Sequence, residues 1–138
     1  MLSRELGIPI VCPDAIRVAM HGHKYISECE PYVWSIAMTM VRSLFMAGHD
    51  SVILDATNTT WERRKVWLGN GWEVDAAVSM LREEDCIKLA ERCGDHVIVP
   101  IIQKMARQYE PIHVDPIGEY GVEGFRTVSF FVLDDGVV

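Results

Sequence analysis

Two short apolar runs, each followed closely by an aspartate, constrain the fold of this chain more than any other feature. The runs are "IPIVC" at 8–12, with Asp14 two positions later, and residues 51–54, with Asp55 directly after them. Continuous aliphatic and β-branched runs are typical of strands that are buried on both faces, as in parallel sheets. Helical periodicity lies between the two runs, so the sequence predicts an α/β fold with a parallel sheet.

The other elements follow from periodicity and from helix start and stop signals. Glu28, Glu30 and Pro31 open a long helix that ends at Gly48, and its apolar stripe predicts a core face. We expect that stripe to comprise Val33, Trp34, Ala37, Met40, Val41, Leu44 and Phe45. Further helices are expected at 2–6 (the tail of a helix), 13–20, 59–68, 82–94 and 97–110, and further strands at 71–80 and 126–133.

Length, charge and hydropathy narrow the class of protein. A chain of 138 residues is most simply one domain, residues 1–138. The net charge of −7 argues against a protein that coats a nucleic-acid backbone. The first residues show no long apolar core and no small-residue cleavage site, so a secretory signal is not expected. No apolar stretch approaches membrane-spanning length, so no membrane partner is expected and a cytoplasmic location is predicted.

The cysteines indicate free thiols rather than a disulfide or metal framework. There are four, and none forms a C-x-x-C pair. A metal site could be assembled from Cys12, His21, His23 and Cys29, but this spacing matches no familiar zinc pattern. No metal site is therefore predicted.

Several segments in order resemble a known family. They are "PDAIR" (13–17), "SVILDATNTTWERR" (51–64), "DCIKLAER" (85–92), "VIVPIIQKMARQYEP" (97–111) and "EGF" (123–125). Together they resemble the polynucleotide-kinase-type branch of the P-loop kinases, over about Leu2 to Phe125. The resemblance implies a three-layer, parallel-sheet P-loop NTPase-like fold. It also implies phosphoryl transfer from ATP, with Mg²⁺, to a hydroxyl of a nucleic-acid end, a nucleotide or a small molecule.

The sequence departs from the family at the phosphate-binding loop. The pattern G-x-x-x-x-G-K-[ST], whose backbone N–H groups and lysine hold the nucleotide phosphates, does not occur in these 138 residues. We therefore expect a fold truncated at its N-terminus, without the first strand, and a kinase that is incomplete or inactive as this chain. The alternative is a non-catalytic remnant that binds a nucleotide, a nucleic-acid end or a protein partner.

The missing first strand also bears on the sheet. Without that strand, strand edges are left unpaired. We expect either direct pairing of strand 51–54 with another strand or a homodimer that fills the gap.

The resemblance also implies roles for particular residues. Asp14 matches the general base and Arg17 the residue that orients the acceptor and its phosphate. Asp55 matches the acid at the end of the Walker-B-like strand, which organises Arg17 or a metal-bound water. Arg92, with Lys88 one turn earlier, matches the cations that neutralise the transferring phosphoryl group.

Structural alternatives stay open for these residues. Asp14 and Asp55 could be turn or capping residues, and Arg17 could be a surface helix residue. Lys88 and Arg92 could form a solvated helix face or interact with the helix dipole. The remaining candidates for substrate binding, Arg63 and Arg64, fit a substrate-facing or a solvated helix start equally well.

Sheet geometry leads to a prediction about the contacts of Arg17 with the two aspartates. If strands 8–12 and 51–54 are parallel neighbours, Asp14 and Asp55 follow the same edge of the sheet. We then expect the Arg17 guanidinium within about 4 Å of Asp14 or Asp55. A site that admits a substrate must also be partly exposed to solvent.

Overall fold

The computed structural model describes residues 7–22, 25–113 and 123–131. It is a mixed α/β protein whose contacts divide it into two compact units, Met1–Thr57 and Asn58–Val138. The expectation of a single domain stays a prediction. Among the described residues, no helix is long and apolar enough to cross a membrane.

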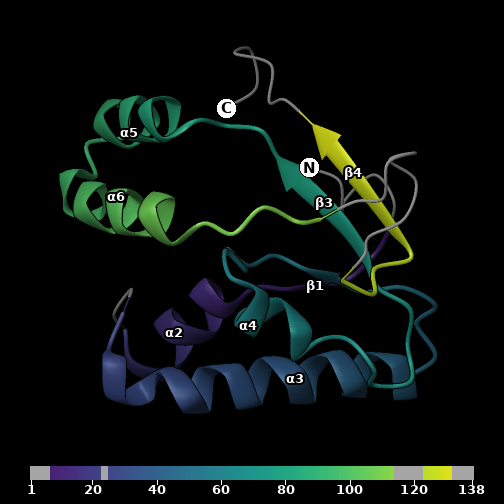
Figure 1. Ribbon diagram of the computed structural model, residues 1–138. Coiled ribbons are helices and arrows are strands. Elements are labelled where there is room, and N and C mark those ends of the chain that lie inside the picture. Colours follow the sequence, from purple (N-terminus) through teal and green to yellow (C-terminus); the bar gives the residue numbers. More distant parts are fainter. Residues whose placement is uncertain (1–6, 23–24, 114–122, 132–138) are drawn as a thin grey trace. The chain divides into compact units, whose positions relative to one another are not determined.

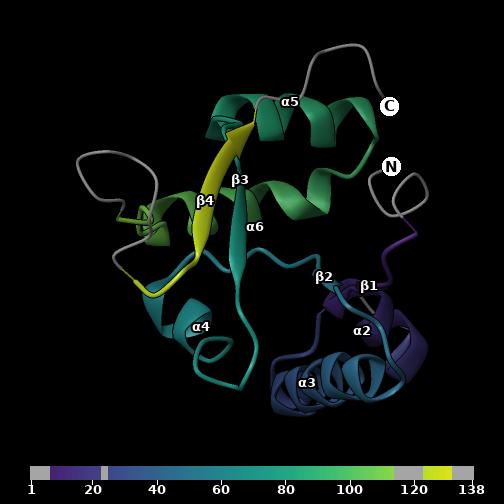
Figure 2. The ribbon, with the colours of Figure 1, turned by 90° about the vertical axis from the view of Figure 1, so that its right-hand side faces the viewer.

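The first unit combines two helices with a pair of short strands. In chain order these are β1 (Ile10–Val11), α2 (Pro13–His21), a 3₁₀ turn at Ser27–Cys29, α3 (Glu30–Met46) and β2 (Ile53–Leu54). Helices α2 and α3 pack against each other, side by side in Figures 1 and 2. The expected helix at 2–6 lies outside the described residues.

Strands β1 and β2 pair directly with each other and are parallel, and the parallel arrangement was predicted. Ile10 pairs with Ile53 and Val11 with Leu54. The predicted strands at 8–12 and 51–54 were too long, because the ladder is only two residues deep. Pro9 has no N–H to donate, although its carbonyl oxygen accepts a hydrogen bond from the Ile53 N–H at 2.9 Å. Strand 51–54 thus pairs directly with another strand, which is the first of the two arrangements that we expected.

The core of this unit lies where α2 and α3 meet β1. Its buried apolar side chains are Val11, Ile16, Val33, Ala37 and Val41. The predicted stripe of α3 is therefore only partly buried. Met40 is exposed, and with Leu44 and Ile10 it lines an open apolar groove of about 490 Å³.

The second unit holds three helices and the other strand pair. It comprises α4 (Trp61–Lys65), β3 (Asp75–Ser79), α5 (Glu83–Arg92), a 3₁₀ turn at His96–Ile98, α6 (Val99–Gln108) and β4 (Thr127–Phe131). Helix α4 and strand β3 are shorter than the predicted 59–68 and 71–80. Gly69 and Gly71 adopt left-handed φ values of 71° and 86° in the turn that separates the two elements.

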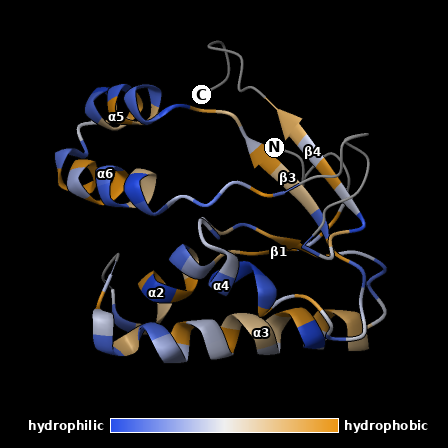
Figure 3. Ribbon diagram, in the orientation of Figure 1, coloured by the Kyte–Doolittle hydropathy of each residue, from blue (hydrophilic) through white to orange (hydrophobic). Residues whose placement is uncertain are grey.

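Strands β3 and β4 also pair in parallel, from Asp75 opposite Thr127 to Ser79 opposite Phe131. Figure 3 shows hydrophobic residues along both strands and a largely hydrophilic α5. The described strands form two separate two-stranded sheets rather than one continuous sheet. The parallel pairing predicted from the apolar runs is confirmed, and the P-loop NTPase-like fold stays a prediction.

Candidate functional site

The candidate site begins at the carboxyl end of β1, where the chain turns into α2. Cys12 is extended (φ −120°, ψ 110°), and Pro13 then starts the helix with a φ that suits its first turn. Asp14 follows in that turn, where the helix dipole favours a negative charge. Its side chain is 84% exposed, so the carboxylate is accessible from solvent.

Arg17 lies one helical turn after Asp14 and is paired with it. Its Nη1 donates to Asp14 Oδ1 at 2.6 Å. The prediction that Arg17 lies within about 4 Å of Asp14 or Asp55 is confirmed for Asp14, and so is the partial solvent exposure of the site. The prediction that Arg17 is a surface residue of the helix is not what the geometry favours, because only 11% of its side chain is exposed.

The stronger partner of Arg17 is Glu30, the first residue of α3. Arg17 Nε and Nη2 donate to the two oxygens of Glu30, each at 2.7 Å, in the bidentate geometry that makes arginine–carboxylate pairs strong. This hydrogen bonding, more than the charge of Asp14, raises the pKa of the Arg17 guanidinium above its usual range. The pair joins α2 to α3.

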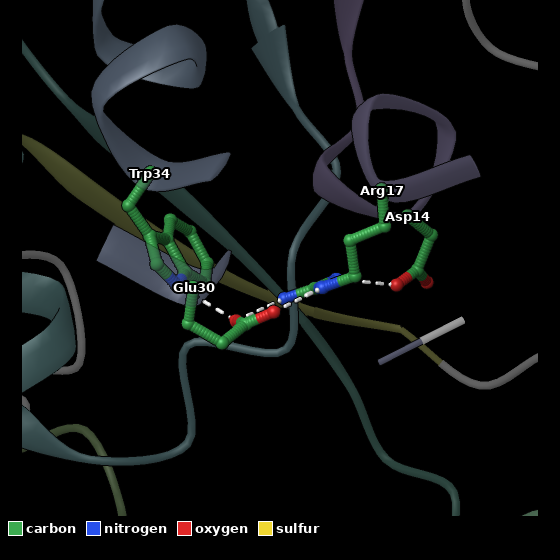
Figure 4. Close-up of polar contacts among 4 residues, drawn as sticks. All are labelled: Asp14, Arg17, Glu30 and Trp34. Atoms are coloured by element: carbon green, nitrogen blue, oxygen red, sulfur yellow. Dashed lines mark hydrogen bonds and ion pairs between the residues drawn. The ribbon is translucent and has the colours of Figure 1, made fainter. Parts of the chain in front are cut away.

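Trp34 completes the cluster one turn along α3 (Figure 4). Its Nε1 donates to Glu30 Oε2 at 3.2 Å. The Arg17 guanidinium carbon lies 5.9 Å from the centre of the Trp34 ring, within the range of a cation–π contact. We call Asp14, Arg17, Glu30 and Trp34 the Arg17 cluster.

Asp55 lies at the same edge of the sheet. Its N–H donates to Val11 O at 3.0 Å, at the point where β1 ends and the chain leads to Asp14. The residue is exposed. The prediction that Asp14 and Asp55 follow the same sheet edge is confirmed by the parallel register, while a role for Asp55 in organising Arg17 stays a prediction.

The arrangement suits proton transfer. Arg17 Nη1 donates to Oδ1 of Asp14, and an exposed carboxylate has further lone pairs that can accept a hydrogen bond from a bound hydroxyl. An exposed carboxylate can accept the proton of a hydroxyl group that binds beside it. In the Arg17 cluster, the exposed carboxylate of Asp14 is therefore held by the nearly buried guanidinium of Arg17.

Arg64 belongs to the second unit and has a different setting from either one predicted. It is neither substrate-facing nor solvated, because only 4% of its side chain is exposed. Nε and Nη2 donate to Glu123 at 2.8 Å each, and Nη1 donates to the Glu110 carbonyl oxygen at 2.9 Å. This geometry favours a structural role. Neighbouring Arg63 is exposed, and its substrate-binding role stays a prediction.

The predicted phosphate-neutralising cations lie on α5. Lys88 is 3.9 Å from Asp85, a loose ion pair on the exposed side of the helix. Arg92 is exposed in the last turn, where it also suits the negative end of the helix dipole. Their proposed roles stay predictions, and the structure describes them with the second unit.

A third arginine with carboxylate partners lies at the start of the β3–β4 pair. Arg126 donates to Asp75 and, at 2.7 Å, to Glu73. Hydrogen bonding from Arg126 is the main reason that the pKa of Asp75 is lowered. The side chain of Arg126 is 54% exposed, so this is a surface pair.

Metal and cofactor ligands are the last element of the prediction. Within the described ranges, no group of three His, Cys, Asp or Glu side chains could hold a metal ion. The four cysteines are free thiols, and His23 of the rejected cysteine–histidine set lies outside the described residues.

Glu30 and Glu123 are the residues that the sequence reasoning did not assign. Glu30 was interpreted only as a helix-opening acid, although its four-residue spacing to Trp34 places the two on one helix face. Glu123 stood in the "EGF" segment without a role. Comparison with protein-family models, with curated proteins and with solved structures found no match.

Proposed function

We propose that this chain carries the acceptor side of a phosphotransferase of the polynucleotide-kinase type. One observation carries the proposal. An exposed carboxylate, Asp14, follows the carboxyl end of a parallel strand and is held by an arginine that is itself almost buried. Ligands of open α/β sheets bind at this edge, and phosphoryl transfer to a hydroxyl needs one base there.

The chemistry assigns a step to Asp14. The oxygen of the acceptor hydroxyl forms a bond to phosphorus as the bond to the leaving oxygen of the donor breaks. The hydroxyl proton passes to Asp14. Arg17, ion-paired to Asp14 at 2.6 Å, fixes the position of the carboxylate. Arg17 thus acts through Asp14 as a positioning residue.

The donor side of the reaction is not assigned to residues of this chain. The resemblance implies ATP and Mg²⁺. The sequence carries no phosphate-binding loop, and the described residues offer no set of three metal-ligating side chains. We therefore expect the 138-residue chain to bind Mg-ATP weakly. Micromolar affinity in titration calorimetry would contradict this.

Two measurements test the proposal. A reading frame upstream of Met1 that encodes a G-x-x-x-x-G-K-[ST] loop would support the proposal, and the protein read from such a longer frame is expected to phosphorylate a hydroxyl acceptor. In it, Asp14→Asn should lower the transfer rate by about 10²-fold or more, as for loss of a general base. A frame without the loop, or an unchanged rate in Asp14→Asn, favours the alternative of a binding remnant.

A further inference from the structure

The hydrogen bonds of Arg17 limit what else this residue can bind. A guanidinium has three nitrogens and five N–H groups. All three nitrogens of Arg17 already donate, Nε and Nη2 to Glu30 and Nη1 to Asp14. The bidentate fork that would grip a phosphate most tightly, formed by Nε and Nη2, is occupied by a residue of the chain itself.

The charges around Arg17 point the same way. Two carboxylates compensate its single positive charge, at 2.6 and 2.7 Å. A phosphate that approached the remaining N–H groups would come close to the exposed carboxylate of Asp14. Like charges at such short distance repel, so Arg17 in this setting is a poor anchor for an anion.

Burial also makes Arg17 a poor anchor for an anion. Glu30 is 17% exposed and Arg17 is 11% exposed, so the fork between them lies largely away from solvent. The Trp34 ring lies beside the guanidinium and its Nε1 holds Glu30 in place. Asp14, in contrast, leaves most of its surface open. Figure 4 shows this order, with Trp34 and Glu30 on one side of Arg17 and Asp14 on the other.

We infer that Glu30 is a positioning residue that commits Arg17 to Asp14, and that the acceptor is an uncharged hydroxyl compound bound without a phosphate on Arg17. The inference rests on the proposed function and names its substrate class. It differs from the role that the family resemblance implies for Arg17, which is to orient the acceptor and its phosphate. The acceptor hydroxyl meets Asp14 directly, and Arg17 stays paired with Glu30.

A matched pair of ligands tests the inference on the intact chain. Adenosine presents neutral hydroxyls, and adenosine 3′-monophosphate differs from it only by a phosphate. Amide-resolved NMR titration gives both the affinity and the residues that respond. We expect adenosine to shift the amides of Asp14 and Arg17 and to bind about tenfold more tightly than the 3′-monophosphate.

Substitutions of Glu30 separate positioning from a merely structural role. Glu30→Gln removes the charge that occupies Arg17, so the preference for adenosine should shrink by about tenfold or reverse. Glu30→Asp keeps the negative charge and should keep the preference for adenosine. Comparing the two variants shows whether a changed preference follows from the lost charge or from any substitution at this position. Glu28→Gln is the matched control, because Glu28 is exposed and lies two residues earlier. It should behave like the wild type.

The outcomes distinguish this inference from the proposed function. Tighter binding of the 3′-monophosphate by the wild type, lost in Arg17→Gln, would overturn the inference and leave the proposed acceptor site standing. An unchanged preference in Glu30→Gln would also overturn it. If neither ligand shifts the amides of Asp14 or Arg17, both the proposed function and the inference fail.

Discussion

Among the described residues, Arg17 and Arg64 each form a bidentate pair with a glutamate, and they differ in the groups that the third guanidinium nitrogen contacts. Arg64 pairs with Glu123, at 4% and 9% exposure, and its remaining nitrogen donates to backbone carbonyl oxygens. Arg17 pairs with Glu30 in the same geometry, but its remaining nitrogen donates to Asp14, whose side chain is 84% exposed.

The difference separates structure from function. Every nitrogen of the Arg64 guanidinium donates a hydrogen bond to a group of the second unit. These bonds connect segments that are distant in sequence. Around Arg17 the same kind of pair supports a carboxylate that faces solvent. A buried, fully used ion pair holds a fold, whereas a nearly buried one with an exposed partner can serve a site.

The largest expected effect on stability comes from breaking the Arg64–Glu123 pair. Arg64→Met leaves the Glu123 carboxylate buried without its partner. We expect it to lower the free energy of unfolding by about 3–5 kcal/mol. Urea unfolding followed by the fluorescence of the protein's tryptophans measures the change.

Arg63→Met is the matched control, because it removes the same side chain from the adjacent, exposed position. It should change the free energy of unfolding by less than about 0.5 kcal/mol. Equal losses in the two variants would show that the Arg64–Glu123 pair does not stabilise the second unit.

Breaking the Arg17–Glu30 pair is expected to lower the free energy of unfolding by a smaller amount. Arg17→Met removes hydrogen bonds to two charged groups, but Glu30 and Asp14 can regain water because they are nearer the surface. A loss of about 2 kcal/mol in the free energy of unfolding is expected. A loss as large as that of Arg64→Met would contradict the distinction between the two pairs.

The two pairs also show what sequence could and could not predict. Apolar runs predicted that β1 and β2 belong to parallel sheet structure, since continuous aliphatic runs between helices are typical of buried parallel strands. The spacing of Asp14 and Arg17 predicted their contact, because residues three apart share a helix face. Both inferences depend on local geometry, and both were confirmed.

The glutamate partners required information that is not local. Glu30 is 13 residues from Arg17 and Glu123 is 59 residues from Arg64. Which acid meets which arginine depends on how helices pack and where loops return. For this reason Arg64 looked like a surface residue in "TTWERR", although its side chain is nearly inaccessible.

The smallest effect on stability is expected from the surface pair of Arg126 and Asp75. Arg126 lowers the pKa of Asp75 by hydrogen bonding, so folding favours the charged carboxylate. Its contribution is present above the unfolded pKa, about 3.9, and is lost as pH falls through the lower folded value.

Arg126→Gln should therefore raise the pKa of Asp75 toward its ordinary value, as measured by carbon-detected NMR titration of the carboxyl group. Because the pair is exposed, the unfolding transition at neutral pH should hardly move. An unchanged pKa of Asp75 would show that the pair does not persist in solution.

The most direct test of the account is the binding of a hydroxyl acceptor to the Asp14→Asn variant. Asp14 makes one ion pair at the exposed end of the Arg17 cluster, so the variant should unfold almost like the wild type. Loss of a hydrogen bond to a charged acceptor should weaken adenosine binding by about tenfold or more, measured by NMR titration. Wild-type affinity in a folded Asp14→Asn protein would contradict the claim that this carboxylate receives the acceptor hydroxyl.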